Sequence, residues 1–221
     1  MKRLVAIGLA VILMLIPIMG MSCGSDSNGN GNVDGNDNVD TTESPIPTHF
    51  TTYTDEMTLF SISYPPNFEL ALSQIDFIEE NVKEILLSID SGLPVEQVYL
   101  IFAAGVPAGM QYSPNVSIGC ESLPGTEWTH DEVIEAEVQS IKSIIEDYHE
   151  FSRTDTTIDG RKATIINFEG TFPTLVKAHL LQMYTCVDKI VWIVTCTSDL
   201  AGFVEYEDDF YHIVRSLRIL K

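Results

Sequence analysis

The fold of this chain is decided by residues 151–168, which read FSRTDTTIDGRKATIINF. Two β-prone runs, at 151–158 and 161–168, flank the dipeptide Asp159-Gly160. Asp-Gly is a strong signal for a two-residue hairpin turn, because glycine accepts the positive φ that such turns demand. This stretch therefore predicts two antiparallel strands joined by a tight turn.

A second hairpin is predicted directly after the first. The runs at 175–187 and 190–197 flank the dipeptide Asp188-Lys189. Residues 191–194 read VWIV and are continuously apolar, which is typical of a strand that is covered on both faces. We therefore expect a four-strand meander whose last strand is buried on both sides.

Helices are predicted around this meander. Apolar residues recur at spacings of three and four in three segments, near 75–89, 134–148 and 203–217. The middle helix has the clearest start, because Thr129 and Glu132 form the S/T-x-x-E pattern of a capping box. Antiparallel hairpins with intervening amphipathic helices indicate an α+β domain, in which helices pack on a mostly antiparallel sheet. Further strands are expected at 51–53, 59–64, 95–104, 115–120 and 218–220.

Four short motifs resemble the PsbP-like superfamily, which includes the extrinsic PsbP protein of photosystem II and DcrB-type bacterial envelope lipoproteins. The resemblance covers about residues 51–221 and implies an α/β/α sandwich, with a mostly antiparallel central sheet and helices packed on both faces. The motifs are FSISYP at 60–65, IDGRKA at 158–163, IVWIVTCT at 190–197, and the pattern of Phe210, Ile213, Ser216 and Leu217 in the last helix.

The resemblance implies little about chemistry, because the superfamily is mostly non-catalytic and its partners differ. This sequence also departs from the pattern. Asn67-Phe68 stands where many relatives carry a "gw" pair after the proline, and the predicted helix at 75–89 is longer than usual. No binding residue of the superfamily is therefore carried over to this chain.

The N-terminus has the pattern of an export signal. A short basic start precedes an apolar run at 4–19, which is 16 residues long. A membrane-spanning helix needs roughly 20 residues, so the shorter run favours a cleaved signal. Residues 20–23, GMSC, resemble the lipobox of bacterial lipoproteins, although Gly20 stands where leucine is usual. Cys23 is therefore the predicted lipid attachment site, with an uncleaved anchor or a plain secretory signal as alternatives.

A disordered tether is expected after the signal. Residues 24–40 are Gly, Asn, Asp and Ser with two valines, which cannot bury enough apolar surface to fold. We expect a lipoprotein signal peptide at 1–22, a tether at 23–47 and a PsbP-like α+β domain at 48–221. The predicted location is the cell envelope, on the extracytoplasmic side of a bacterial membrane, where the lipid on Cys23 anchors the protein.

The chain is strongly acidic. It has 32 Asp and Glu against 12 Lys and Arg, which gives a net charge of −20. Such a surface repels nucleic acid and anionic headgroups, so a nucleic-acid partner is excluded. The charge favours solubility and is compatible with cationic partners.

No motif carries recognisable catalytic or cofactor chemistry. The sequence has no G-x-S-x-G elbow, no P-loop and no G-x-G-x-x-G. Acid pairs such as Glu79-Glu80 and Asp208-Asp209 are expected to be solvated. No catalytic residue, cofactor or metal ligand is therefore predicted. The histidines lack a partner at metal-ligand spacing and are expected at the surface or at helix caps; they are His49, His130, His149, His179 and His212.

One stretch of the tether matches a calcium-loop pattern. Oxygen-bearing side chains between Asp26 and Asp37 follow the ligand spacing, with Gly31 at the turn position. No helix is predicted on either side, and a tether rich in Gly, Asn and Asp produces this pattern by chance. We expect a solvated segment there rather than a metal site.

Apart from the predicted lipid site, the chain has three cysteines. A two-residue turn in the second hairpin pairs Cys186 with Val191 and Cys196 with Leu181. The two cysteines then lie on opposite faces, about 16 Å apart along the strands, which is beyond the reach of a disulfide. Cys186 and Cys196 are expected not to be bonded to each other. A bond from Cys120 to one of them and three free thiols both stay open.

Two functional classes follow. The first is a non-enzymatic binding or accessory module, lipid-anchored outside the cytoplasm, with an unknown protein or small-molecule partner. The second is an envelope enzyme with a site assembled from dispersed residues. A site with converging titratable groups favours the enzyme, whereas a broad apolar or acidic patch favours the binding module.

Overall fold

The structure, a computed structural model, covers most of the predicted domain. The predicted signal peptide at 1–22, Cys23, the Asp26–Asp37 pattern and, apart from Ile75, the helix expected at 75–89 lie outside the described residues. The described residues are 47–57, 59–72, 75, 98–106, 113–123, 128–172 and 176–220.

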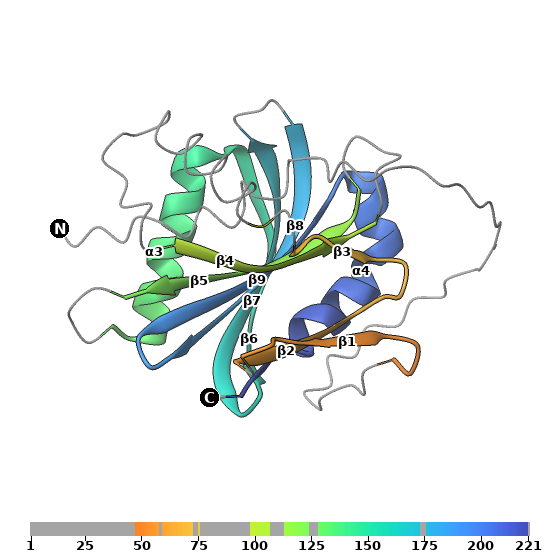
Figure 1. Cartoon of the computed structure of the whole chain (residues 1–221). Coiled ribbons are helices and arrows are strands. Elements are labelled where there is room, and N and C mark those ends of the chain that lie inside the picture. Colours follow the sequence, from red (N-terminus) through yellow and green to blue (C-terminus); the bar gives the residue numbers. More distant parts are fainter. Residues whose placement is uncertain are drawn as a thin grey trace.

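The centre of the domain is a seven-stranded sheet in which every pair of neighbours is antiparallel (Figure 1). The predicted four-strand meander is confirmed, and its last strand, β9, lies in the middle of the sheet, where nearly all its side chains are buried. The strands follow the order β3 (Glu69–Leu70), β4 (Val98–Gly105), β5 (Asn115–Ser122), β9 (Ile190–Ser198), β8 (Val176–Val187), β7 (Arg161–Phe172) and β6 (Glu146–Ile158).

Both predicted hairpin turns are present. Asp159 and Gly160 have φ of 51° and 74°, and Asp188 and Lys189 have φ of 49° and 66°. Positive φ at both central residues is the geometry whose twist matches that of the flanking strands. The second turn fixes the register that the sequence predicted, with Val187 opposite Ile190.

The domain also has a second, smaller sheet, which the sequence did not distinguish from the central one. It consists of β1 (Thr51–Thr54), β2 (Phe60–Tyr64) and β10 (Arg218–Ile219), with β2 in the middle. Ser216, just before β10, ties the two ends of the domain together, because its Oγ accepts a 2.8 Å hydrogen bond from the Ser63 backbone amide.

Helix α3 (His130–Ile144) begins at the predicted capping box, in which the Thr129 and Glu132 side chains each accept from the other's backbone amide. Its end differs from the prediction, which extended the helical stripe to Tyr148. Ile145 is already extended, with φ −96° and ψ 124°, and β6 begins at Glu146. Gly170 permits this exit, because a Cβ there would lie 2.1 Å from the Ile145 Cγ2. Strand β6 therefore starts five residues before the predicted Phe151.

Helix α4 (Leu200–Arg215) confirms the last predicted helix, with Asp199 as its N-cap. The Asp199 carboxylate accepts a 2.7 Å hydrogen bond from the Gly202 backbone amide. The buried side of α4 contacts β8, β9 and β2. Among the described residues, neither helix combines the length and the apolar character that crossing a membrane requires.

The two helices lie on opposite sides of the central sheet (Figure 1), as expected for an α/β/α sandwich. Side chains alternate between the two sides along each strand. The side covered by α4 and the small sheet, called the α4 face, includes Ile165, Leu181, Met183, Trp192 and Val194. The side covered by α3, called the α3 face, includes Ile166, Phe168, Leu180, Tyr184 and Ile193.

Candidate functional site

The most unusual chemistry of the described domain lies between α3 and β5, where two carboxyl groups are buried. Glu121 on β5 is 2% exposed and Glu137 on α3 is 1% exposed. Among the described residues, the Oε2 atoms of both side chains have no hydrogen-bond partner. A buried ionised carboxylate without a partner is costly, and such a group takes up a proton instead.

The pKa values of the two carboxyl groups follow from this burial. Burial raises the pKa of Glu121 to about 8. Burial, and then the charge of Glu121, raise the pKa of Glu137 well above its usual range. At neutral pH the pair is therefore largely protonated, and it can donate as well as accept hydrogen bonds.

A row of polar side chains continues from the acid pair across the α3 face. The Tyr184 hydroxyl donates a 2.5 Å hydrogen bond to the Gln182 Oε1, and the Gln182 Nε2 donates a 3.0 Å bond to the Thr195 Oγ1. Ser117 lies opposite Thr195 on β5, and within the described part of the chain its buried Oγ has no partner. Burial, and then the charge of Glu137, raise the pKa of Tyr184. The α3 face thus has a polar interior beneath an amphipathic helix.

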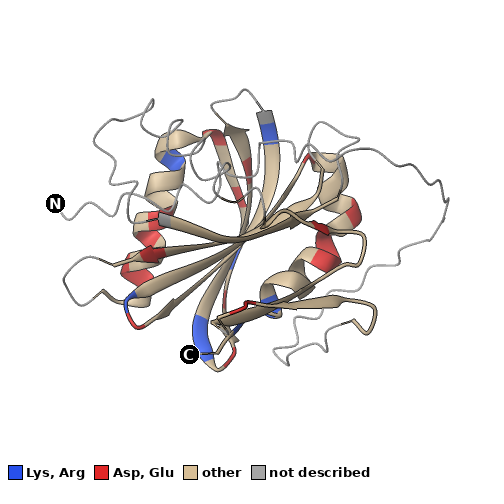
Figure 2. Ribbon diagram, in the orientation of Figure 1, with Lys and Arg blue, Asp and Glu red and all other residues tan. Residues whose placement is uncertain are grey.

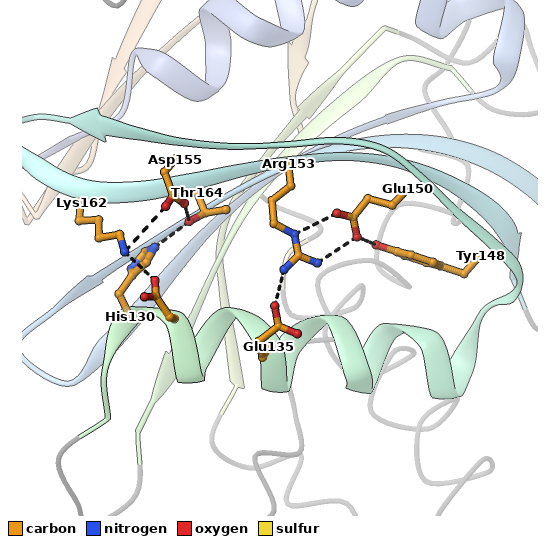
Figure 3. Close-up of polar contacts among 9 residues, drawn as sticks. His130, Glu135, Tyr148, Glu150, Arg153, Asp155, Lys162 and Thr164 are labelled. Atoms are coloured by element: carbon orange, nitrogen blue, oxygen red, sulfur yellow. Dashed lines mark hydrogen bonds and ion pairs between the residues drawn. The ribbon is translucent and has the colours of Figure 1, made fainter.

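One set of polar contacts holds α3 over this interior (Figure 3). Arg153 on β6 donates to the Glu135 Oε1 on α3 at 2.5 Å and to both carboxylate oxygens of Glu150 at 2.9 Å. The Tyr148 hydroxyl also donates to the Glu150 Oε2, at 2.9 Å. Arg153 therefore joins the middle of α3 to the edge strand of the sheet.

A second set holds the first turn of α3 (Figure 3). The Lys162 Nζ lies 2.6 Å from the Asp131 Oδ1, and the His130 Nε2 lies 2.9 Å from the Thr164 Oγ1. The Thr164 hydroxyl donates to the Asp155 Oδ1 at 2.7 Å. These contacts attach the first turn of α3, which begins at His130, to β6 and β7.

The histidines do not meet in one place. His130 lies at the start of α3, as expected of a histidine near a helix cap, while His49, His149 and His212 contact Phe50 or Phe151 edge-on. Within the described ranges, no group of three or more His, Cys, Asp and Glu is arranged to hold a metal ion.

His179 differs from the expectation of a surface or capping histidine. Its ring stacks on Phe203 of α4, with centroids 3.6 Å apart and planes at 4°, and on Phe151 of β6 at 4.9 Å. Its Nε2 lies 2.6 Å from the Asn167 Oδ1, which makes this nitrogen the donor. Burial lowers the pKa of His179 to about 4, so the ring is neutral at neutral pH.

The three cysteines are free, and the strand register separates them. Cys186 lies opposite Val191 on the α3 face, whereas Cys196 lies opposite Leu181 on the α4 face, as predicted. Cys120 shares the α4 face with Cys196 but lies four positions along β5 from its cross-strand neighbour, or about 13 Å. A disulfide tolerates Cα separations of about 4.4–6.8 Å, so no two of these cysteines can be joined in this fold.

Sequence reasoning missed the acid pair, although one signal was present. Glu137 lies three residues after Ile134 and four before Ile141, so it falls on the apolar stripe of the predicted helix. A charged residue on an apolar stripe predicts a buried ionisable group. Its position close enough to feel the charge of Glu121 could not be predicted, because that requires α3 to pack on the central sheet.

The fold that surrounds the buried acids and the polar row is shared with other proteins. No protein-family model matches the sequence, and a comparison with curated proteins finds no significant match either. Two of the solved structures that are similar to this chain match it across most of their own length.

One is cyanobacterial PsbP (CyanoP) from Synechocystis sp. PCC 6803, with a TM-score of 0.50 and 10% identity over 78% of this chain and 94% of that one. The described domain has a PsbP-like fold. The other structure is LpqN of Mycobacterium tuberculosis, described as involved in cell envelope biogenesis, with a TM-score of 0.50 and 9% identity over 73% of this chain and 83% of that one. At these identities the likeness establishes the PsbP-like fold alone.

Proposed function

We propose that this protein is a lipid-anchored, extracytoplasmic binding or accessory module without catalytic activity. The observation that carries the proposal is the position of Cys23. A 16-residue apolar run and Gly20–Ser22 precede it, and a Gly/Asn/Asp-rich segment that leads to a PsbP-like domain follows it. Lipid on Cys23 would attach the chain to a membrane, and the tether would lift the domain clear of the headgroups.

Two further observations support an accessory role. LpqN, which has a similar fold, is described as involved in cell envelope biogenesis. In addition, both described helices of this chain carry acidic residues (Figure 2), most of which are exposed, so the domain would be repelled by anionic headgroups and by nucleic acid. A cationic or neutral partner in the envelope suits such a surface.

The ionisable groups of the domain also support a non-catalytic role. Two ion pairs dock α3 on the sheet: Arg153 pairs with Glu135, and Lys162 pairs with Asp131. His179 is neutral and is used in a ring stack. These side chains therefore have structural tasks, and none of them pairs with a nucleophile.

The anchor is tested with Cys23→Ser in the full chain, expressed in a bacterium and fractionated into membrane and soluble parts. Loss of the thiol that receives the lipid should release the protein from the membrane or leave its precursor uncut. Cys120→Ser is the matched control and should stay on the membrane. A mature N-terminus at any residue other than a lipid-modified Cys23 would contradict the proposal.

An envelope enzyme is the second candidate, and the Glu121–Glu137 pair is the observation that favours it. Two buried acids whose pKa values are raised resemble a general acid–base site. Complementation of a deletion strain with Glu121→Gln and Glu137→Gln separates the two candidates. If the folded variants restore the phenotype, the acids are structural; if they fail while still capturing the same membrane partners, the enzyme is favoured.

A further inference from the structure

The outer edge of β6 is the longest open strand edge of the described domain. Strand β6 is the last strand of the seven-stranded sheet and has 13 residues, whereas β3 at the opposite edge has two. From Glu146 to Thr157 every side chain of β6 is exposed or half-buried, and no other described strand pairs with the outer edge of β6. An open edge offers unpaired amides and carbonyls to another strand.

Part of this edge lacks the features that usually block pairing. Both register irregularities of β6 lie before Ser152, and Ser152–Ile158 pairs regularly with β7. The segment reads SRTDTTI and contains no proline and no lysine. Bulges, proline and charged side chains, lysine above all, are the common means by which proteins protect an edge. This half of β6 has only the charges of Arg153 and Asp155, which a partner of opposite charge would accept.

The hairpin turn determines which groups point outward. Ile158 and Arg161 flank the two-residue turn and exchange backbone hydrogen bonds with each other. Hydrogen-bonded and non-bonded positions alternate along an antiparallel strand. The amides and carbonyls of Arg153, Asp155 and Thr157 therefore point away from β7, towards solvent.

We infer that β6 pairs with β6 of a second copy of this chain, antiparallel and about a two-fold axis at Thr154. In this register the Arg153 of each copy lies opposite the Asp155 of the other, on the side that α3 covers (Figure 3). Opposite charges facing one another across two strands stabilise the pair. An axis at Asp155 instead would place two aspartates face to face, which is destabilising.

The remaining pairs of this register are also complementary. Thr154 meets its own copy on the axis, and Ser152 meets Thr156, so hydroxyl groups face hydroxyl groups on the α4 face. Asp155 is accessible for such a contact, because its side chain is 64% exposed. Arg153 is 28% exposed and already contacts Glu135 and Glu150, so its guanidinium would share its remaining donors with the Asp155 of the other copy. The interface is isologous, so it closes at two copies and gives one continuous sheet across the dimer.

The contact is short, so the dimer is weak in dilute solution. A stable interface buries about 1,200–2,000 Å² in total, more than one pair of short strand segments supplies. If the proposed anchor holds the chain on a membrane, confinement raises the effective concentration of the second copy. The pairing itself does not depend on the lipid.

Disulfide trapping tests this pairing in the full chain, in membranes of the producing cells and in detergent solution. Thr154→Cys places two thiols on the axis, where the Cα atoms of a non-hydrogen-bonded pair lie about 4.5 Å apart, within disulfide range. Thr157→Cys is the matched control: it is equally exposed on β6, but its two copies would lie about 20 Å apart. The unsubstituted protein measures the background from Cys120, Cys186 and Cys196.

We expect Thr154→Cys to form a covalent dimer at least about tenfold faster than Thr157→Cys under mild oxidant, given this difference in separation. Adding Asp155→Lys to Thr154→Cys should abolish the excess, because lysine then faces Arg153 of the other copy. Equal rates for the two cysteine variants, or no dimer from either, overturn the inference. Cross-linking of the Thr154→Cys variant to a different polypeptide would also overturn it, in favour of a strand donated by another protein.

Discussion

The two faces of the central sheet are built on different principles. The α4 face is filled by aromatic and aliphatic side chains, including Phe60, Phe102 and Phe210, each at most 1% exposed. The α3 face is apolar around a polar interior that contains Glu121 and Glu137. Apolar packing depends little on pH, whereas buried carboxyl groups make stability depend on it. The comparison predicts that the α3 face makes the stability of the domain fall in alkali, whereas the apolar packing of the α4 face does not.

The largest expected effect comes from the α4 face. Phe210→Ala removes a fully buried ring that contacts Phe203 and Tyr206. Such truncations cost about 3–5 kcal/mol. Denaturant unfolding at pH 5 and pH 8 should show the same loss at both values. Val204→Ala is the control, because Val204 is 76% exposed on the same helix, and it should change the free energy of unfolding by less than about 0.5 kcal/mol. A loss that differs strongly between the two pH values would contradict the contrast between the faces.

The second effect concerns the α3 face and the acid pair. In the unfolded chain a glutamate titrates near pH 4.5, whereas Glu121 in the fold titrates near 8. Between these values the folded protein binds more protons than the unfolded one, so the free energy of unfolding falls as the pH rises. Glu121→Gln should remove about 2–4 kcal/mol of this fall between pH 4.5 and 8.

The measurement is the slope of unfolding free energy against pH, because a buried amide also has its own desolvation cost. Glu207→Gln, an exposed glutamate of α4, is the control and should keep the wild-type slope. If Glu121→Gln leaves the slope between pH 4.5 and 8 unchanged, the acid pair is not buried in solution as the structure has it.

The smallest expected effect is the pH dependence of stability that His179 causes in acid. His179 packs on the α4 face, and burial lowers its pKa to about 4 from 6.5. Between these values the unfolded chain binds more protons, so the histidine weakens the fold as the pH falls. His179→Phe keeps the ring stack and should reduce the loss on going from pH 6.5 to 4 by about 1 kcal/mol, after allowance for solvent screening.

Thermal or denaturant unfolding across this acid range gives the answer. The exposed His149 supplies the matched control, because His149→Phe replaces a histidine of β6 without changing the stack of His179 on Phe203. If His149→Phe reduces the loss of stability between pH 6.5 and 4 as much as His179→Phe does, the effect comes from general charge and not from the stacked ring.

The sequence predicted the local structure well where one short pattern decides it. Asp159-Gly160 set the first hairpin, Thr129 with Glu132 set the start of α3, and the two-residue turn at Asp188 set the register that separates the cysteines. Each of these features depends on a few neighbouring residues, so the chain itself contains the information.

The features that the sequence did not predict depend on contacts between distant segments. The small sheet requires Phe60 to meet Ile219, and the acid pair requires α3 to cover the face of the sheet that holds Glu121. The end of α3 was predicted four residues late, because Tyr148 follows the helical spacing by coincidence. Tyr148 lies in the irregular start of β6, between the residue pairs Glu146–Thr171 and His149–Glu169, and local periodicity does not report this pairing with β7.

The separation of Cys186 and Cys196 in the finished fold makes early oxidation of these two thiols harmful to folding. In an unfolded chain the segment between Cys186 and Cys196 is short, and loops of this size close in about 10–100 ns. Encounters between the two thiols are therefore frequent until β8 and β9 pair and place them on opposite faces. In an oxidising compartment a disulfide formed in that interval would be incompatible with the finished hairpin and would trap the chain. Productive folding then becomes a race between strand pairing and thiol oxidation, and slow folding variants should accumulate as Cys186–Cys196 linked species that a reductant rescues.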